Sequence, residues 1–282
     1  MRISDAFLSP RIISVAVAAA LSACSFAPAL ALEPQTGPAT VAIAPIFKDI
    51  RSALRQGIEG YQAGDFVTSV KALKYAADGG QPLARWKLGQ MYANGDGVPG
   101  DHHTAYQYFA QIIRSYDVDR SNPRERSIVA SAFVSVGVYD LSGIPNTNVR
   151  RNPERALEMF HFAATNFGDA NAQYQMARMY LDGNGVKRDQ RVAIQWLGQA
   201  AEKNHVEAQA VLGDILFKFK PNPPNRRARG LMYLTLAREA VGARPEEQWI
   251  VESYQSAMAV ATEDEKRRAH EQLGNFLKRR AR

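Results

Sequence analysis

The sequence of 282 residues has a single cysteine, Cys24, and little that could span a membrane. One cysteine cannot form an intramolecular disulfide, which excludes a small fold held together by disulfides. The apolar segment 12–23 is too short to cross a bilayer, and no later segment is apolar enough. With 46% hydrophobic and 22% charged residues, the chain is expected to fold around a hydrophobic core of its own.

Motifs of catalytic chemistry are also absent from the sequence. It contains none of the patterns HExxH, SxxK, GxSxG and GxxxxGK, which hold metals, nucleophiles or phosphates. Among the five histidines, His102 and His103 are adjacent, so their side chains would diverge on a helix and not share a metal. We therefore expect a protein that is not an enzyme, with no catalytic residue, no metal, no cofactor and no small-molecule substrate.

Residues 1–31 have the features of a bacterial export signal. Two arginines and the apolar segment 12–23 precede a small-x-small pattern, which predicts cleavage after Ala31 and a soluble mature chain in the periplasm. Residues 32–46 would then form an N-terminal linker. The four residues that end at Cys24 (LSAC) instead fit the lipobox of bacterial lipoproteins, so a lipid-anchored product is the alternative.

Positive charge exceeds negative charge, with 35 Lys and Arg against 28 Asp and Glu and a net charge of +7. This balance suggests acidic partners, although many exported proteins are basic without a specific reason. Nucleic acid is excluded as a partner because the excess is spread along the chain, with no basic helix interleaved with aromatic residues. Export would also separate the protein from the genome.

Two stretches that lie 88 residues apart are closely alike: YANGDGVPGDHHTAYQY at 92–108 and YLDGNGVKRDQRVAIQW at 180–196. A catalytic loop is needed once, whereas a structural unit recurs as often as the architecture stacks it. Each stretch carries a pair of glycines, which admit positive φ and would end one helix and reverse the chain before the next. These turn glycines are Gly95, Gly97, Gly183 and Gly185.

Helix starts recur with the same period. A buried-looking helix position, occupied by Ala76 first and by Ala237 last, recurs at steps of 36, 51, 37 and 37 residues. Eleven residues before it stands a side chain that can accept hydrogen bonds from the first turn of a helix. These four predicted caps are Asp65, Asp101, Asn152 and Asp189.

This spacing predicts about five helix-turn-helix repeats over residues 47–242. The 51-residue step contains two insertions, 115–127 and 144–152, which we expect to be loops. In the repeat that begins at Val206, a proline-rich segment replaces the glycine turn, and Asn225 is the expected cap. Residues 243–282 predict two further helices that form a polar C-terminal cap, the second starting with a capping box between Thr262 and Glu265.

The glycine-turn stretches, in LGQMYANGDGV and ARMYLDGNGVKRDQRVAIQWLGQAAE, resemble the Sel1-like repeat family, which is related to the tetratricopeptide repeats. The resemblance covers about residues 47–242. It implies an all-α fold, a right-handed superhelical solenoid of helix-turn-helix repeats.

The whole chain is also similar to exported Sel1-like regulators of exopolysaccharide synthesis. This similarity implies a periplasmic negative regulator, which binds the periplasmic sensing domain of a membrane histidine kinase and so inhibits two-component signalling. It also implies a periplasmic protease as a second partner, for which the turn DGGQPLA at Asp78 is a candidate segment. A lipid-anchored Sel1-like scaffold of a polysaccharide secretion complex is the alternative, and Cys24 keeps it open.

The two insertions are the predicted partner-binding segments. Insertions between repeats often carry binding residues, and arginine and tyrosine are favoured at interface hot spots. The alternative is that these charged side chains only keep a loop solvated. The candidate partner-binding residues are Tyr116, Arg120, Arg124, Arg150 and Arg151.

Overall fold

The computed structural model describes residues 47–117, 122–218, 223–242 and 247–280. The predictions for the export signal, the linker, Ala31 and Cys24 concern residues before 47, and Arg120 falls in 118–121, so all of these lie outside the described residues. The described residues belong to one unit that begins at Phe47.

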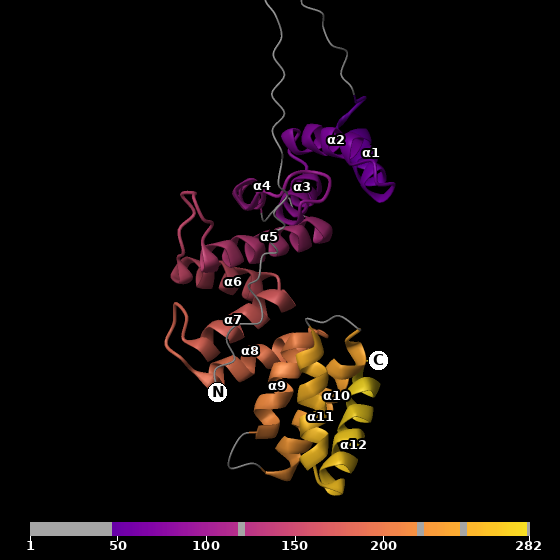
Figure 1. Cartoon of the computed structure of the whole chain (residues 1–282), viewed down its shortest axis with the longest axis vertical. Helices are drawn as coiled ribbons and strands as arrows, with labels where there is room; N and C mark the ends of the chain where they lie inside the picture. The colour runs from indigo at the N-terminus through magenta and orange to yellow at the C-terminus, as the bar shows by residue number, and fades with distance from the viewer. Residues whose placement is uncertain (1–46, 118–121, 219–222, 243–246, 281–282) are drawn as a thin grey trace, which may run out of the picture. The chain divides into compact units, whose positions relative to one another are not determined.

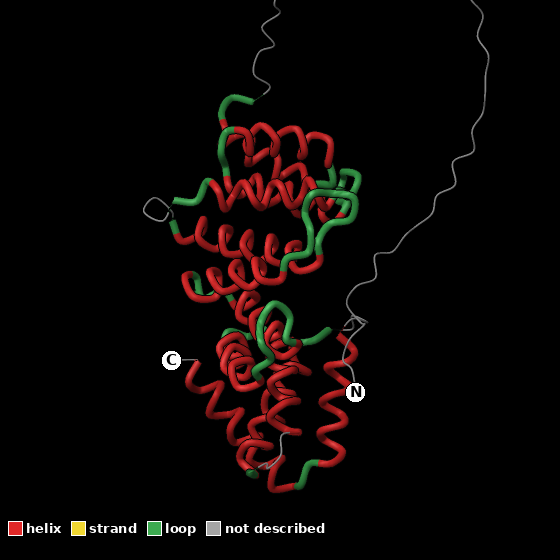
Figure 2. The backbone as a smooth tube through the Cα atoms, turned by 90° about the vertical axis from the view of Figure 1, so that its left-hand side faces the viewer, coloured by secondary structure: helices red, strands yellow, loops and turns green. Residues whose placement is uncertain are grey.

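The described residues form twelve α-helices and no strand (Figure 2). Their bounds are α1 Ile50–Gln62, α2 Phe66–Asp78, α3 Pro82–Asn94, α4 His102–Arg114, α5 Pro123–Ser142, α6 Pro153–Asn166, α7 Ala170–Asp182, α8 Gln190–Glu202, α9 Val206–Lys218, α10 Pro224–Ala240, α11 Gln248–Val260 and α12 Glu263–Arg280.

The first ten helices pack as five consecutive hairpins, α1–α2 through α9–α10, and each hairpin also contacts the next (Figure 1). Helix α12 packs on α10, and α11 contacts both α9 and α10. The chain is therefore an all-α solenoid of helical hairpins closed by two C-terminal helices, which confirms the predicted fold class. No helix among the described residues is both long enough and apolar enough to span a membrane.

The four predicted cap residues each stand directly before the second helix of a hairpin. The Asp65 carboxylate accepts from the Thr68 amide, and Asp101 accepts from the His103 and Thr104 amides. Asn152 and Asp189 do the same at the starts of α6 and α8. Each side chain thereby satisfies amides of the first turn that have no partner within the helix.

The turn glycines set how one hairpin sits on the next. Gly95 and Gly183 end α3 and α7 with φ of +76° and +71°, in the left-handed region. The second glycine of each pair has a further role, because a Cβ on Gly97 would lie 2.2 Å from Cβ of Phe66. A Cβ on Gly185 would lie 2.7 Å from Cβ of Pro153, so neither position has room for a side chain. Both glycines thus let a turn touch the first residue of the preceding hairpin's second helix.

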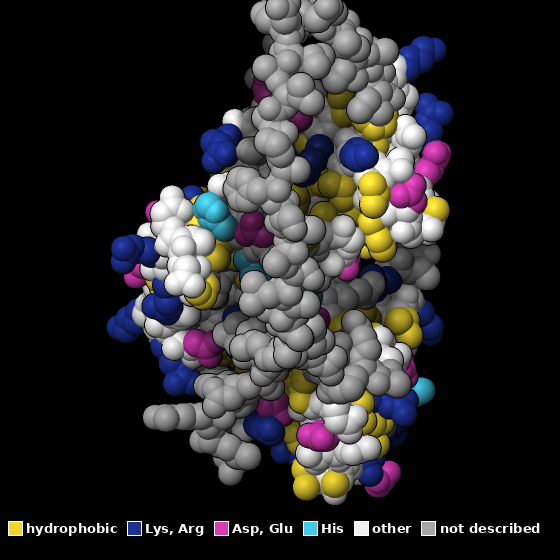
Figure 3. Space-filling view, turned by 45° about the horizontal axis from the view of Figure 1, so that its top comes forward, with side chains coloured by type: hydrophobic (Ala, Val, Ile, Leu, Met, Phe, Trp, Pro, Cys, Tyr) yellow, Lys and Arg dark blue, Asp and Glu magenta, His cyan; other side chains and the backbone are white. Residues whose placement is uncertain are grey.

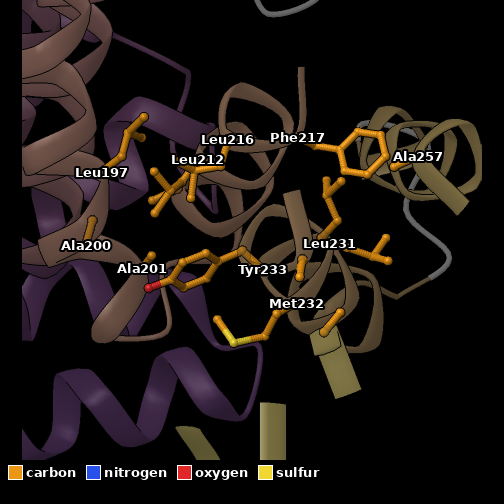
Figure 4. Packing of buried hydrophobic residues seen from close by; sticks show 14 of the residues in the cluster. Leu197, Ala200, Ala201, Leu212, Leu216, Phe217, Leu231, Met232, Tyr233 and Ala257 are labelled. Carbon is orange, nitrogen blue, oxygen red and sulfur yellow. The ribbon is translucent and has the colours of Figure 1, made fainter. Parts of the chain in front are cut away.

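The core runs along the stack as successive clusters of small and large apolar side chains. Small residues on the first helices let rings from the second helices approach closely: a Cβ on Gly89 or Gly137 would lie 2.6 Å from the ring of Phe109 or Phe160. Figure 4 shows the C-terminal cluster, to which α9 and α10 contribute Leu212, Leu216, Leu231 and Tyr233, the last only 1% exposed.

The prediction that residues 115–127 form a loop is wrong for its second half, because α5 begins at Pro123. Asn122 accepts from the amides of Arg124 and Glu125, and the Glu125 carboxylate accepts from the Asn122 amide, which makes a capping box. Proline at the first helical position needs no hydrogen-bond partner for its nitrogen. The 51-residue step has 15 residues more than the 36-residue step: α5 supplies seven of them, with 20 residues in place of the 13 of α3 or α7, and the connections before and after α5 supply the other eight.

The cap predicted at Asn225 is also wrong. Helix α10 begins at Pro224 with Pro223 as its N-cap, so Asn225 lies inside the first turn. The reason is the same as in α5: a proline at the first helical position favours a helix start. At the C-terminus, the predicted capping box between Thr262 and Glu265 is confirmed, with N–O distances of 2.9 and 3.2 Å.

Candidate functional site: a basic groove between α4 and α6

A groove of about 540 Å³ lies between α4 and the start of α6, bounded by the end of α5 and by the α5–α6 loop. We call it the basic groove, because four arginines and a single acidic side chain line it. The charged lining residues are Arg114, Asp140, Arg150, Arg151 and Arg155. With histidine neutral, four positive charges against one negative charge leave a net charge of +3.

One wall is a face of α4. His103, Gln107, Gln111 and Arg114 follow one another at steps of four, four and three residues, so they lie along one side of the helix. The start of α4 is fixed by Asp101, whose carboxylate caps it at 2.9 and 3.1 Å. This wall presents two amides that can both donate and accept hydrogen bonds, followed by a guanidinium at the end of the helix.

The opposite wall is the α5–α6 loop, which corresponds to the predicted insertion 144–152. Its ends are held together because the Ile144 amide donates to the Val149 carbonyl at 2.8 Å, and the side chains of both residues are buried. Gly143 begins the loop with φ of +72°, and a Cβ there would lie 2.9 Å from the Arg151 nitrogen. The loop is thus an ordered turn in which Ile144 and Val149 are buried and Arg150 is exposed.

Asp140 lies at the base of the groove and is only 1% exposed. Its Oδ2 is 3.3 Å from Nε of Arg155, and no described residue makes a hydrogen bond to that oxygen. Burial raises the pKa of the Asp140 carboxyl, and the nearby Arg155 guanidinium opposes that rise. The charged form of the buried carboxylate is therefore only weakly stabilised, and its main partner is an arginine that is itself half exposed.

The arginines of the groove differ in how they are held. Arg151 donates to Oδ1 of Asn184 in the α7–α8 turn, which ties the loop to the next hairpin. Arg155 pairs with Asp140. Arg114 and Arg150 are exposed, and neither forms an ion pair or side-chain hydrogen bond with any residue that the structure describes. Two guanidinium groups are thus available to a ligand without breaking an internal contact.

The predicted partner-binding residues are only partly brought together. Arg150 and Arg151 line the basic groove, whereas Arg124 is exposed on the first turn of α5 and does not line it. The ring of Tyr116 is half buried and packs edge-on against Phe167 at a centroid distance of 5.7 Å, so it is part of the core.

The groove also contains residues that the sequence analysis did not select: Arg114, Asp140 and Arg155. They lie on regular helices, outside the two predicted insertions. A signal for two of them was present in the sequence, because Arg114 shares the helix face of His103 and Gln107, and Arg155 follows the cap Asn152 by three residues.

A second groove, of about 960 Å³, lies between α8 and the start of α10. Its lining on α8 repeats that of the basic groove, because Arg191, Ile194 and Gln195 stand 2, 5 and 6 residues after the cap Asp189. His103, Tyr106 and Gln107 stand at the same distances after Asp101. We call it the α8–α10 groove, and it provides an internal comparison for the first.

Basic side chains alone do not distinguish the groove. In the space-filling view, Lys and Arg side chains are spread over the visible face, interspersed with Asp and Glu (Figure 3). The basic groove has four arginines against one acidic side chain and the α8–α10 groove has three against one, so what distinguishes the basic groove is the wall that the α5–α6 loop adds. No group of three or more His, Cys, Asp or Glu side chains that could hold a metal occurs within the described ranges.

Of the predicted turn segment DGGQPLA, residues 79–81 connect α2 to α3, Asp78 ends α2 and the last three residues lie in α3. Asp78, Gly79 and Gly80 are exposed, and Gly80 has φ of +87°. The turn is nevertheless closed by backbone hydrogen bonds, since the Gln81 amide donates to the Ala76 carbonyl at 3.0 Å. A protease would therefore have to open it locally before cleaving it.

Comparison with known proteins identifies the repeats. The Sel1 repeat family matches residues 82–115, 140–166 and 170–205, which correspond to α3–α4, the end of α5 with α6, and α7–α8. A solved structure of a Sel1 repeat protein from Oxalobacter formigenes superimposes with a TM-score of 0.58 at 24% identity, over 83% of this chain and 89% of that one. This likeness concerns the fold alone.

Two curated relatives cover most of the chain. A protein of Rhizobium meliloti (strain 1021), named "Exopolysaccharide production negative regulator", is 31% identical over 92% of this chain and 91% of its own length. A protein of the same name from Rhizobium leguminosarum bv. viciae is 32% identical over 76% of this chain and 77% of its own length.

Proposed function

The chain belongs to the Sel1-repeat family of exopolysaccharide production negative regulators, and on this premise we propose that it represses exopolysaccharide synthesis by binding another protein. The observation that carries the proposal is the similarity to the Rhizobium meliloti protein, which extends over 92% of this chain. A protein that shared only some of the repeats with this relative would align over only a part of the chain. The solenoid supports the proposal because stacked repeats provide an extended surface for a protein partner.

The partner in this proposal is the periplasmic sensing domain of a membrane histidine kinase. While the regulator is bound, the kinase is held inactive and less of its response regulator is phosphorylated. A periplasmic protease would relieve the inhibition by removing the regulator, with the exposed turn after Asp78 as a cleavage segment. The export signal predicted from the sequence of residues 1–31 supports this placement in the periplasm, because it would bring the chain to the side of the membrane where sensing domains lie.

The proposed mode of action is non-catalytic. Binding a kinase domain requires no nucleophile, metal or cofactor, and the proposed role needs only a surface that distinguishes its partner. The basic groove is such a surface, with a net charge of +3 and two guanidinium groups that form no ion pair with any residue the structure describes. Arginine at the centre of an interface is favoured because its planar group forms bidentate bonds to carboxylates.

A scaffold of a polysaccharide secretion complex is the second candidate, favoured by the lipobox that ends at Cys24. The two candidates predict opposite effects of deleting the gene. Loss of a repressor raises exopolysaccharide production, whereas loss of a secretion scaffold lowers it.

The deletion experiment tests the proposal directly. Exopolysaccharide and response-regulator phosphorylation are measured in the deletion strain, in the same strain carrying the full gene, and in a strain that also lacks the kinase. The proposal expects both quantities to rise on deletion, to return with the gene, and to stay low without the kinase. A fall in exopolysaccharide on deletion, or a rise that persists without the kinase, would contradict it. A Cys24→Ser gene serves as the matched control, since the repressor should work without lipidation.

A further inference from the structure

The basic groove combines two kinds of group that can bind a peptide, side-chain amides and guanidinium groups. Along α4, Gln107 and Gln111 offer amides that can bond to the main chain of an extended peptide, with one donor and one acceptor group each. At the end of this row and across from it, Arg114 and Arg150 offer guanidinium groups that no described residue occupies.

The dimensions favour a short extended segment. The row from His103 to Arg114 covers eleven residues of helix, a rise of about 16 Å. An extended peptide rises about 3.3 Å per residue, so the row matches about five residues. A lone phosphate or carboxylate would contact one end of the row and leave both glutamines without a role.

The charge of the groove favours carboxylates on that segment. The single acidic side chain, Asp140, is buried and already paired with Arg155, so it does not neutralise the two exposed arginines. A peptide with side chains that alternate between the two faces of the strand would direct every second carboxylate toward the arginine side.

We propose that the basic groove binds an extended acidic peptide segment of a protein partner, with the glutamines of α4 holding its main chain and Arg114 and Arg150 its carboxylates. This inference rests on the proposed function only in taking the partner to be a protein. Asp140 moderates the affinity by drawing Arg155 toward the base of the groove, away from the ligand.

The test uses the chain from residue 32 to its end and an array of eight-residue peptides that contain zero to four aspartates. Binding is expected to increase with the number of aspartates and to weaken with added salt. In the variant with Arg114→Ser and Arg150→Ser, affinity for the four-aspartate peptides is expected to fall by about tenfold. Asp140→Asn, which releases Arg155, is expected to raise it about twofold.

The control variant carries Arg51→Ser and Arg55→Ser. It has the same change in net charge, but both arginines are exposed on α1, outside the groove. Its affinity should stay within twofold of the wild type, and circular dichroism confirms that every variant is folded.

Three outcomes overturn the inference: binding that does not depend on aspartate number, equal losses in the two double variants, or competition by inorganic phosphate or trigalacturonate at concentrations as low as those of the peptide. The last result would make the groove a site for small anions. None of these outcomes bears on whether deletion of the gene raises exopolysaccharide, so the two proposals can fail separately.

Discussion

The basic groove and the α8–α10 groove are lined by the same positions of two repeats and yet present different surfaces. In both, the residues 2, 5 and 6 places after a helix cap line the groove. In the first groove, two of these positions are occupied by His103 and Tyr106. In the second groove, the same two positions are occupied by Arg191 and Ile194. The α5–α6 loop then closes the first groove and brings Arg150 and Arg151 to it, whereas the second is lined by the α7–α8 turn, α8 and Arg226.

The difference shows how a repeat protein can acquire a site without changing its framework. The helix cap and the positions that line the groove stay the same, so the stacking of hairpins is preserved. A longer α5 and an ordered loop add the new wall, and the loop holds itself through Ile144 and Val149. Changes that affect the framework should therefore reduce stability in both regions, while changes of the groove arginines should affect binding alone.

Gly185→Ala is expected to lower stability more than the loss of a helix cap. The residue has φ of +71°, and the new Cβ would lie 2.7 Å from Cβ of Pro153, where α6 begins. Backbone strain and the clash together should cost about 3 kcal/mol in the free energy of unfolding. Chemical denaturation measures it.

Gly64→Ala is the control for that substitution. Its φ is +76°, but nothing lies within 4 Å of the new Cβ. It should cost only the strain of about 1 kcal/mol. Equal losses for the two variants would show that the contact between the turn and Pro153 contributes nothing.

Removal of a helix cap should have an intermediate and equal effect in the two regions. Asn152→Ala leaves the Arg155 amide without its partner, and Asp189→Ala does the same to the Arg191 and Val192 amides. Each should lower the free energy of unfolding by about 1 kcal/mol. A loss at Asn152 several times that at Asp189 would mean that the α5–α6 loop depends on its side chain for more than capping.

The repeat framework could be predicted from sequence because its determinants are local. A cap such as Asp101 and the amides that it satisfies lie within three residues, and a turn glycine such as Gly183 acts on its own φ. The start of α5 also has a local signal, the Asn-Pro-x-Glu sequence of its capping box. The irregular 51-residue repeat step nevertheless led to the prediction of a loop at these residues.

The basic groove could not be predicted in the same way. Its charged residues come from α4, α5, the loop and α6, and they meet only because α5 has 20 residues and the loop turns back on itself. Tyr116 illustrates the same limit, since the sequence offers no sign that Phe167, 51 residues later, covers its ring. Tertiary contacts of this kind depend on the number of turns between caps.

A smaller effect is expected from pH, at a site outside both grooves. His205 precedes α9 and stacks on Tyr174, and burial lowers the pKa of its imidazole while Glu207 partly opposes the shift. The folded state thus favours neutral His205 more than the unfolded state does. Stability is therefore highest above the ordinary value of about 6.5 and falls as the pH drops from there through the lowered pKa.

His205→Gln should flatten the fall in unfolding free energy between pH 7 and pH 5. The control His270→Gln replaces an exposed histidine and should leave the fall unchanged. Thermal unfolding at several pH values measures the stability of the two variants and of the wild type. A fall of undiminished size in the His205 variant would assign the pH dependence to other groups.

The smallest effect on stability is expected for Arg114→Ser and Arg191→Ser, one in each groove. Both side chains are exposed, so the free energy of unfolding should change by less than about 0.5 kcal/mol. Binding of a protein partner should separate them, with a loss for Arg114→Ser and little change for Arg191→Ser. Equal losses of binding would mean that the inserted loop does not define the site.

The most direct test of the account is an equilibrium binding measurement between the chain from residue 32 onward and the purified periplasmic sensing domains of the host's membrane histidine kinases. The account predicts saturable binding to one of these domains, weakened by Arg114→Ser with Arg150→Ser and retained in the variant with Arg51→Ser and Arg55→Ser. Absence of binding to every sensing domain, with a chain that is folded by circular dichroism, would contradict it.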